Sequence, residues 1–129
     1  MAGVRRNIGI DAVSDRFIDG IVALDGAMSG VMASDAASVI RNVAPTLQFR
    51  GREQELSYYD LLVLWHVAAM AIPDINARQN AAHGGPIFLP WHRYYMIQLE
   101  QWLQIVIDDS DFGLPYWDWA ADGDLPRDQ

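Results

Sequence analysis

The three histidines of this chain are placed where they could bind one metal ion together. His66 lies in the apolar run LLVLWHVAAM, which is typical of a buried helix, and His92 lies in the first turn of another predicted helix. His83 lies in the loop that joins these two helices, beside Gly84 and Gly85. Antiparallel neighbours would bring the three imidazoles together inside a helical bundle, where metal sites are commonly built.

Three imidazoles without a cysteine or an evident carboxylate ligand suit copper or zinc. The chain has no cysteine, which excludes thiolate metal sites, disulfides and cysteine nucleophiles. A zinc hydrolase would also need a carboxylate that activates water, and no HExxH-like motif occurs. The residues alone do not choose between the two metals, and a histidine on an apolar helix face is often only a core residue.

Three helices are expected to carry most of the fold. Ser14 is a plausible N-cap for a first helix of about fifteen residues that stops near Gly30. Ser57 opens a second helix, which Pro73 ends. Pro90 suits the first turn of the third. This last helix should bury one face and leave three polar residues largely off it: Glu100, Gln101 and Gln104.

The remaining segments are expected to be mostly irregular. Residues 1–10 are predicted as an extended entry segment, residues 34–43 as a short helix and residues 48–56 as a loop. Residues 73–89 contain two prolines and two adjacent glycines and should form a long ordered loop, a kind that is usually functional in compact domains. Near the end, Trp117 and Trp119 are expected in the core, and Asp118 is expected to have a structural role.

Composition limits the classes of function. With 129 residues, of which 51% are hydrophobic, the chain suits a single domain over residues 1–129. Its net charge of −8 argues against nucleic-acid binding, which needs a basic patch. No apolar stretch is long enough to span a bilayer, and the N-terminus lacks the apolar run of a signal peptide. These features lead us to expect a location in the cytoplasm, or secretion without a classical signal.

The segment from His83 to Arg93, HGGPIFLPWHR, is far more specific. It resembles the first copper motif of tyrosinases, catechol oxidases and molluscan hemocyanins, in which a histidine is followed after eight residues by a second one inside FLPWHR. Downstream, YYMIQLEQWL with Glu100 and the segment LPYWDW resemble the same family. Upstream, Trp65-His66 resembles the site of the family's first histidine, and VRRN resembles the start of bacterial tyrosinases.

This resemblance implies a mainly α fold, namely half of a tyrosinase-like helical bundle around a dicopper site, with long loops. It implies that His66, His83 and His92 are the metal ligands and catalytic residues of the first of two type 3 copper ions. The complete family site uses dioxygen to hydroxylate monophenols at the ortho position, and to oxidise o-diphenols or aminophenols to quinones. The implied protein is therefore a copper oxidoreductase of the monooxygenase or polyphenol oxidase kind, of bacterial origin, with a phenol and dioxygen as its small-molecule partners.

The family's second copper needs three more histidines, and none is left here. We expect a second polypeptide to supply them. A homodimer that brings two histidine trios together is an alternative, because isologous interfaces permit it. The chain could instead be a half that binds one copper or none, or a protein that binds dioxygen without catalysis. A membrane partner is not expected.

Overall fold

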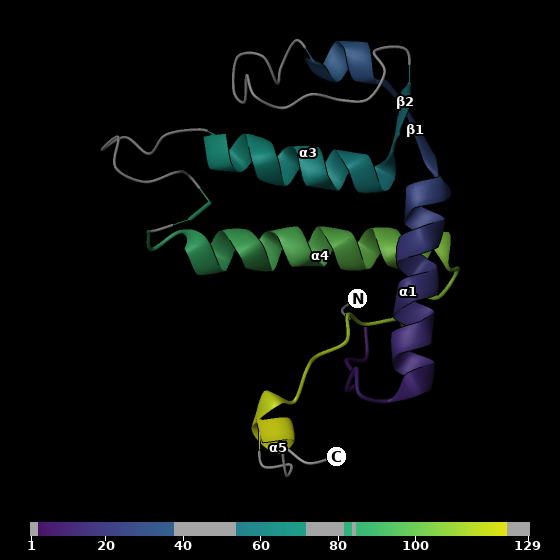
Figure 1. The fold of residues 1–129 in the computed structure, drawn as a ribbon, viewed down its shortest axis with the longest axis vertical. Coiled ribbons are helices and arrows are strands. Elements are labelled where there is room, and N and C mark those ends of the chain that lie inside the picture. The colour runs from purple at the N-terminus through teal and green to yellow at the C-terminus, as the bar shows by residue number, and fades with distance from the viewer. Residues whose placement is uncertain (1–2, 38–53, 72–81, 84, 124–129) are drawn as a thin grey trace.

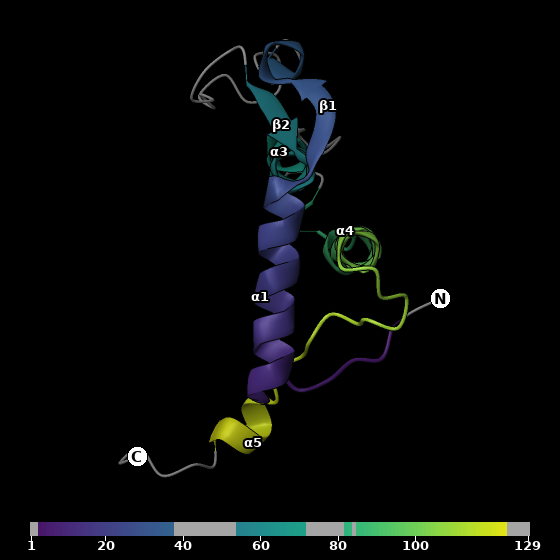
Figure 2. The same cartoon turned by 90° about the vertical axis from the view of Figure 1, so that its right-hand side faces the viewer.

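The structure is a computed structural model in which residues 3–37, 54–71, 82–83 and 85–123 are described. Most of these residues are helical, which confirms the expected mainly α fold. Its elements are, in chain order, α1 (Asp11–Gly26), β1 (Met28–Met32), β2 (Glu55–Ser57), α3 (Tyr58–Ala71), α4 (Phe88–Val106) and α5 (Trp119–Gly123). Helices α3 and α4 lie side by side and α1 runs across them (Figures 1 and 2). No helix among the described residues has the length and apolar content needed to cross a membrane.

Helix α1 begins earlier and ends earlier than its sequence predicts. It starts at Asp11, where the carbonyl of Ile10 accepts the backbone N–H of Ser14 at 3.1 Å. Ser14 is therefore inside the first turn, and its hydroxyl donates to the carbonyl of Asp11 instead of capping the helix. The predicted N-cap was wrong: the helix begins three residues before Ser14, with Ile10 as its N-cap and no side chain capping it. The helix also ends at Gly26, before the predicted stop at Gly30.

Two short strands follow that the sequence did not predict. Strands β1 and β2 pair antiparallel, with Met28 opposite Ser57 and Met32 opposite Glu55. The register shifts between Met28 and Val31, and Gly30 has a φ of +79° there, a value that favours glycine. The predicted loop over residues 48–56 is thus wrong at its C-terminal end, where β2 begins. Residues 48–53 of that loop lie outside the described residues, and so do residues 38–43 of the helix predicted over residues 34–43. Residues 33–37 are helical.

Helix α3 starts where the sequence indicates. The hydroxyl of Ser57 accepts the backbone N–H of Asp60 at 3.0 Å, and the Asp60 carboxylate accepts the N–H of Ser57 at 3.0 Å. This reciprocal pair is a capping box, which satisfies two backbone donors at the start of the helix. The helix ends at Ala71. Pro73, the predicted stop, lies outside the described residues, as do residues 73–81 and 84 of the loop predicted over residues 73–89. The last two residues of that predicted loop belong to α4, which begins at Phe88.

The main core forms where α1 crosses the two paired helices. Leu24 of α1, Leu62 of α3 and Leu103 of α4 pack together with Phe112 and Leu114, and all five are almost fully buried. These contacts hold the N-terminal end of α3 and the C-terminal end of α4. His66 and His92 lie toward the opposite ends of the same two helices, so the core sets the distance between the helices that carry them.

A pair of extended segments covers the C-terminal part of α4. Residues 3–8 run parallel to residues 111–116, with bridges between Val4 and Phe112 and between Asn7 and Tyr116. They bury Glu100, which is only 3% exposed, so the prediction that this residue lies off the buried face was wrong. Helical periodicity identified the face that packs on other helices, but it could not identify a second face covered by extended chain.

The aromatic segment near the end also differs from expectation. Trp117 and Trp119 are 63% and 70% exposed, so their predicted core position was wrong. Trp119 begins α5, where the sequence predicted irregular chain, and the Asp118 carboxylate accepts the backbone N–H of Ala121 at 3.2 Å. This bond confirms a structural role for Asp118 and explains the short helix, because it satisfies one of the free donors at its start.

Candidate metal centre

The three histidines converge. His66 comes from α3, His92 from α4, and His83 from the segment that precedes α4. One ligand nitrogen from each lies within 4.8 Å of the other two. The ring centroids are 5.1 Å apart for His66 and His83, 4.9 Å for His83 and His92, and 5.7 Å for His66 and His92. All three rings are partly buried, so the cluster has one side toward protein and one toward solvent.

The His92 ring has a defined orientation and tautomer. Its Nδ1 lies 2.8 Å from the carbonyl oxygen of Phe88, one helical turn earlier. Because a carbonyl only accepts, Nδ1 carries the proton and donates it, which leaves Nε2 with its lone pair free for a metal. A second ring, that of Phe88, lies 4.3 Å from the His92 ring and restricts its rotation. A metal-binding histidine commonly has such a partner for its other nitrogen.

Aromatic side chains pack behind His66. Trp91 and Tyr95 of α4 stack on each other with centroids 5.3 Å apart, and both touch the His66 ring at 5.6 Å. The Tyr95 hydroxyl donates to the carbonyl of Leu62 at 3.1 Å, which links α4 to α3. Burial raises the pKa of Tyr95, with a smaller effect of Tyr59, so its hydroxyl stays protonated as a donor.

The surroundings of His66 favour its neutral form. Burial lowers the pKa of His66, and the nearby His83 and His92 lower it further. Only a neutral imidazole has a lone pair for a metal, so the lowered pKa of His66 favours the form that can bind a cation. No carboxylate joins the cluster among the described residues, and the chain has no cysteine.

This donor set fits a first-row transition metal. Two nitrogens bound to one ion at about 2.0–2.1 Å lie roughly 3.3 Å apart in a tetrahedral arrangement, so ligand atoms within 4.8 Å need only small side-chain adjustments. Imidazole suits copper and zinc alike, so the geometry alone does not choose between them.

Comparison with known proteins distinguishes copper from zinc at the level of the family. Residues 56–129 match the family model described as the common central domain of tyrosinase. The chain belongs to the tyrosinase family. The match begins just before α3 and covers all three histidines, and proteins of this family bind copper.

Individual relatives agree with the family assignment. The chain is 47% identical over 64 residues to a tyrosinase of Streptomyces glaucescens, a match that covers 50% of this chain and 22% of the relative. It is 42% identical over 64 residues to a tyrosinase of Streptomyces antibioticus, with the same two shares. A 5,6-dihydroxyindole-2-carboxylic acid oxidase of Carassius auratus is 38% identical over 76 residues, which are 54% of this chain and 15% of that protein. The chain thus spans less than a quarter of these curated relatives. No solved structure matched the chain.

Two charged residues of α4, Arg93 and Glu100, lie outside the histidine cluster. Arg93 follows His92 directly and has no ion pair within the described part of the chain. Glu100 pairs instead with Arg5. Sequence reasoning also missed the supporting roles of Phe88 and Tyr95, for which spacing gave a signal: one precedes His92 by four residues and the other follows it by three, so both share its side of α4.

Proposed function

We propose that His66, His83 and His92 hold one copper ion, and that this chain forms the first-copper half of a two-copper site that oxidises phenols with dioxygen. The observation that carries the proposal is the convergence of the three ligand nitrogens to within 4.8 Å of one another. Membership of the tyrosinase family supports copper over zinc and phenols as substrates. The products would be o-diphenols or o-quinones, from monophenols, o-diphenols or aminophenols.

In this proposal the protein's part is to hold and orient the ligands. A bound copper pair supplies the redox chemistry with dioxygen. The carbonyl of Phe88 fixes the proton of His92 on Nδ1, so that the lone pair of Nε2 would be free to bind the copper. Trp91 and Tyr95 cover one side of His66 and keep water from it, which maintains the neutral ring. These contacts fix the ligands before the metal binds, so little reorganisation is needed on binding.

The second copper requires histidines that do not occur among these 129 residues. We propose that a second polypeptide brings them, packed against the paired helices. Large apolar side chains exposed on α3 and α4 support such a cover, since exposed apolar surface is typical of interfaces. They include Val63, Met70, Leu89, Met96, Ile97 and Ile105. A homodimer is the alternative, in which two copies join their histidine trios.

Copper stoichiometry tests the first part of this proposal. The purified chain should bind one copper per chain at saturation, measured by elemental analysis after removal of free metal. Binding of zinc with no copper, or of no metal at all, would contradict it. The same preparation should not convert catechol to quinone unless the second histidine set is added.

Native mass spectrometry of the assembled protein tests the second part. Two different chains with two copper ions would support the second polypeptide, and two identical chains with two copper ions would support the homodimer. A two-copper assembly that binds dioxygen reversibly and forms no quinone from catechol would instead identify a non-catalytic dioxygen-binding protein.

A further inference from the structure

Helix α3, which carries His66, has no polar face that determines which of its sides turns toward α4. After Asp60 in the first turn, every residue of the helix except His66 is apolar. An amphipathic helix is oriented because only one stripe of its surface is apolar, and a helix that is apolar all round lacks this constraint. The direction in which His66 points from α3 therefore depends on specific contacts with neighbouring side chains.

Trp65, the residue before His66, makes three aromatic contacts with α4. Its ring centroid lies 5.7 Å from that of Trp91, 5.7 Å from that of Tyr94 and 5.3 Å from that of Tyr95. These separations fall within the range of about 4.5 to 7 Å at which aromatic rings attract each other. The three partners follow the i, i+3, i+4 spacing and so share one side of α4. Trp65 is therefore held against a single aromatic surface of that helix.

The same aromatic surface contacts His66. The stacked rings of Trp91 and Tyr95 each lie 5.6 Å from the His66 ring, so Trp65 and His66 share two partners. Adjacent residues point about 100° apart around a helix, so both sets of contacts hold only over a narrow range of rotation. The Tyr95 hydroxyl also donates to the carbonyl of Leu62, which limits sliding of α3 along α4.

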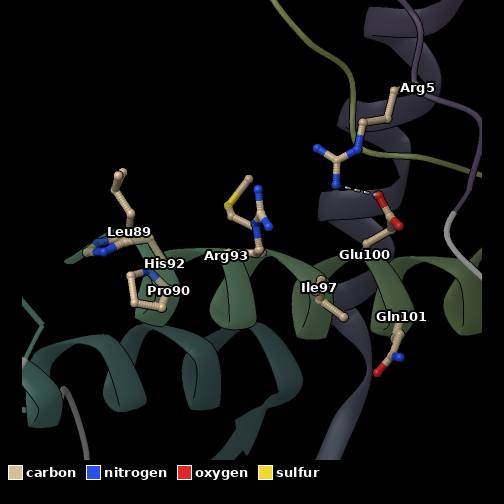
Figure 3. Close-up of a pocket in the computed structure, with 9 residues that line it drawn as sticks. Arg5, Leu89, Pro90, His92, Arg93, Ile97, Glu100 and Gln101 are labelled. Atoms are coloured by element: carbon tan, nitrogen blue, oxygen red, sulfur yellow. Dashed lines mark ion pairs between the residues drawn. The ribbon is translucent and has the colours of Figure 1, made fainter. Parts of the chain in front are cut away.

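The opposite side of α4 does not face α3. Figure 3 shows that Leu89, Arg93 and Glu100 project from α4 away from α3. A second aromatic contact between the two helices joins Tyr58 of α3 to Trp102 of α4, with ring centroids 5.3 Å apart. It lies at the other end of the helix pair, eight residues before His66 in α3. The helices thus have one aromatic contact beside the histidines and one remote from them.

We propose that Trp65 is a positioning residue of the metal centre, whose contacts with α4 fix the rotation of α3 and so direct the His66 ring toward His83 and His92. Of the three histidines, α3 carries only His66. Without the Trp65 contacts, α3 could turn and bury other apolar side chains, and the His66 ring would then leave the cluster. That the rings positioned in this way hold copper rests on the proposed function.

The first measurement uses the metal-free chain. Nuclear Overhauser effects between the ring protons of His66 and His83 report the convergence directly, because their centroids are 5.1 Å apart. The chain has only three histidines, so their ring signals can be assigned. The unchanged chain should show this effect. Trp65→Leu should lose it, because leucine keeps an apolar side chain but removes the ring contacts with α4.

Trp102→Leu is the matched control. It makes the same substitution, and Trp102 is also partly buried against the main core and also joins α3 to α4. This variant should lose stability but keep the effect between His66 and His83. Trp65→Phe retains a smaller ring and should show the effect at reduced intensity. It decides the question if circular dichroism shows that Trp65→Leu does not fold.

The second measurement titrates the folded variants with copper(II) and records the electron paramagnetic resonance spectrum at saturation. Trp65→Leu should bind copper about 10- to 100-fold more weakly, as is typical when a residue that orients a ligand is lost. Its saturated spectrum should differ from that of the unchanged chain, because the His66 nitrogen no longer occupies the same position. Trp102→Leu should match the unchanged chain in both respects. A merely structural role of Trp65 would lower stability and leave the spectrum of the bound copper as it is.

An undiminished effect between His66 and His83 in folded Trp65→Leu would overturn the proposal, and so would an unchanged copper(II) spectrum. If Trp65→Leu does not fold, an undiminished effect in Trp65→Phe would overturn it. Loss of the effect in folded Trp102→Leu would also overturn it, because any weakening of the helix contact would then suffice. If the unchanged chain binds no copper, the proposed function fails, and the ring contacts in the metal-free variants still decide the role of Trp65.

Discussion

A guanidinium nitrogen of Arg5 lies 3.4 Å from a carboxylate oxygen of Glu100, but the two side chains differ greatly in exposure. The arginine is 49% exposed and the carboxylate 4% exposed. The same carboxylate accepts the backbone N–H of Leu114 at 2.9 Å and that of Gly3 at 3.3 Å. Glu100 thus joins α4 to both extended segments that cover it, whereas Arg5 reaches it from the surface.

This asymmetry predicts unequal losses of stability. Replacing Glu100 by Ala should lower the free energy of unfolding by about 2–4 kcal/mol, because two backbone donors lose their acceptor. Replacing Arg5 by Ala should cost only about 0–1 kcal/mol, since a half-exposed partner is screened by solvent. Urea unfolding of the three proteins measures both values. Equal losses would show that the ion pair, and not the backbone hydrogen bonds, holds the segments.

Close approach of the two extended segments gives a second prediction. A Cβ atom at Gly113 would lie 2.7 Å from the carbonyl carbon and oxygen of Val4, closer than such atoms come. Gly113→Ala should therefore lower the free energy of unfolding by about 1–3 kcal/mol, as overpacking does.

Gly26→Ala is the control for this experiment, because a Cβ there meets nothing within 4 Å. Gly26 ends α1, and alanine favours helix over glycine, so the control should be neutral or slightly stabilising. Both values come from thermal or urea unfolding followed by circular dichroism. A control that lost as much stability as Gly113→Ala would contradict crowding against Val4 as the cause of the loss.

Sequence periodicity predicted the elements that carry the histidines better than the rest of the fold. Apolar spacing and Ser57 placed the start of α3, and Pro90 marked the start of α4 to within a few residues. His92 falls in the second turn of α4, one turn later than predicted, because the helix begins at Phe88. The convergence of the three rings followed from two adjacent helices and their loop.

Long-range contacts account for what the sequence did not reveal. Pairing of β1 with β2 and of residues 3–8 with residues 111–116 depends on partners far away in the chain. Glu100 is polar and looked like a surface residue, yet distant backbone donors make its burial favourable. Trp117 and Trp119 show the opposite error, since large aromatic side chains are usually buried and these are exposed.

The Tyr95 hydroxyl gives a third prediction. Tyr95→Phe removes its hydrogen bond to the Leu62 carbonyl but keeps the stacking on Trp91, so it should cost about 1 kcal/mol of stability. Tyr95→Ala removes both and should cost about 3–5 kcal/mol. Tyr94→Phe is the control, because Tyr94 is 55% exposed, its ring contact with Trp65 of α3 is kept in phenylalanine, and its hydroxyl makes no hydrogen bond within the described residues. This variant should be within about 0.5 kcal/mol of the unchanged chain. Urea unfolding gives all three values, and a larger loss in Tyr94→Phe than in Tyr95→Phe would contradict the assigned contact.

The histidine cluster gives the last prediction. Replacing His66, His83 or His92 by Ala should each abolish stoichiometric copper binding, because two imidazoles hold the ion much more weakly than three, and His92→Ala should also abolish oxidase activity of the assembled protein. Copper content after gel filtration measures the first effect, and quinone formation from catechol measures the second. Far-ultraviolet circular dichroism of each variant checks that α3 and α4 still form.

Phe88→Leu is a milder test of ligand orientation. It keeps the backbone carbonyl that holds His92 but removes the ring beside it, so copper should bind about 10-fold more weakly and remain stoichiometric at saturation. Full copper content in a folded His92→Ala variant would refute its role as a ligand.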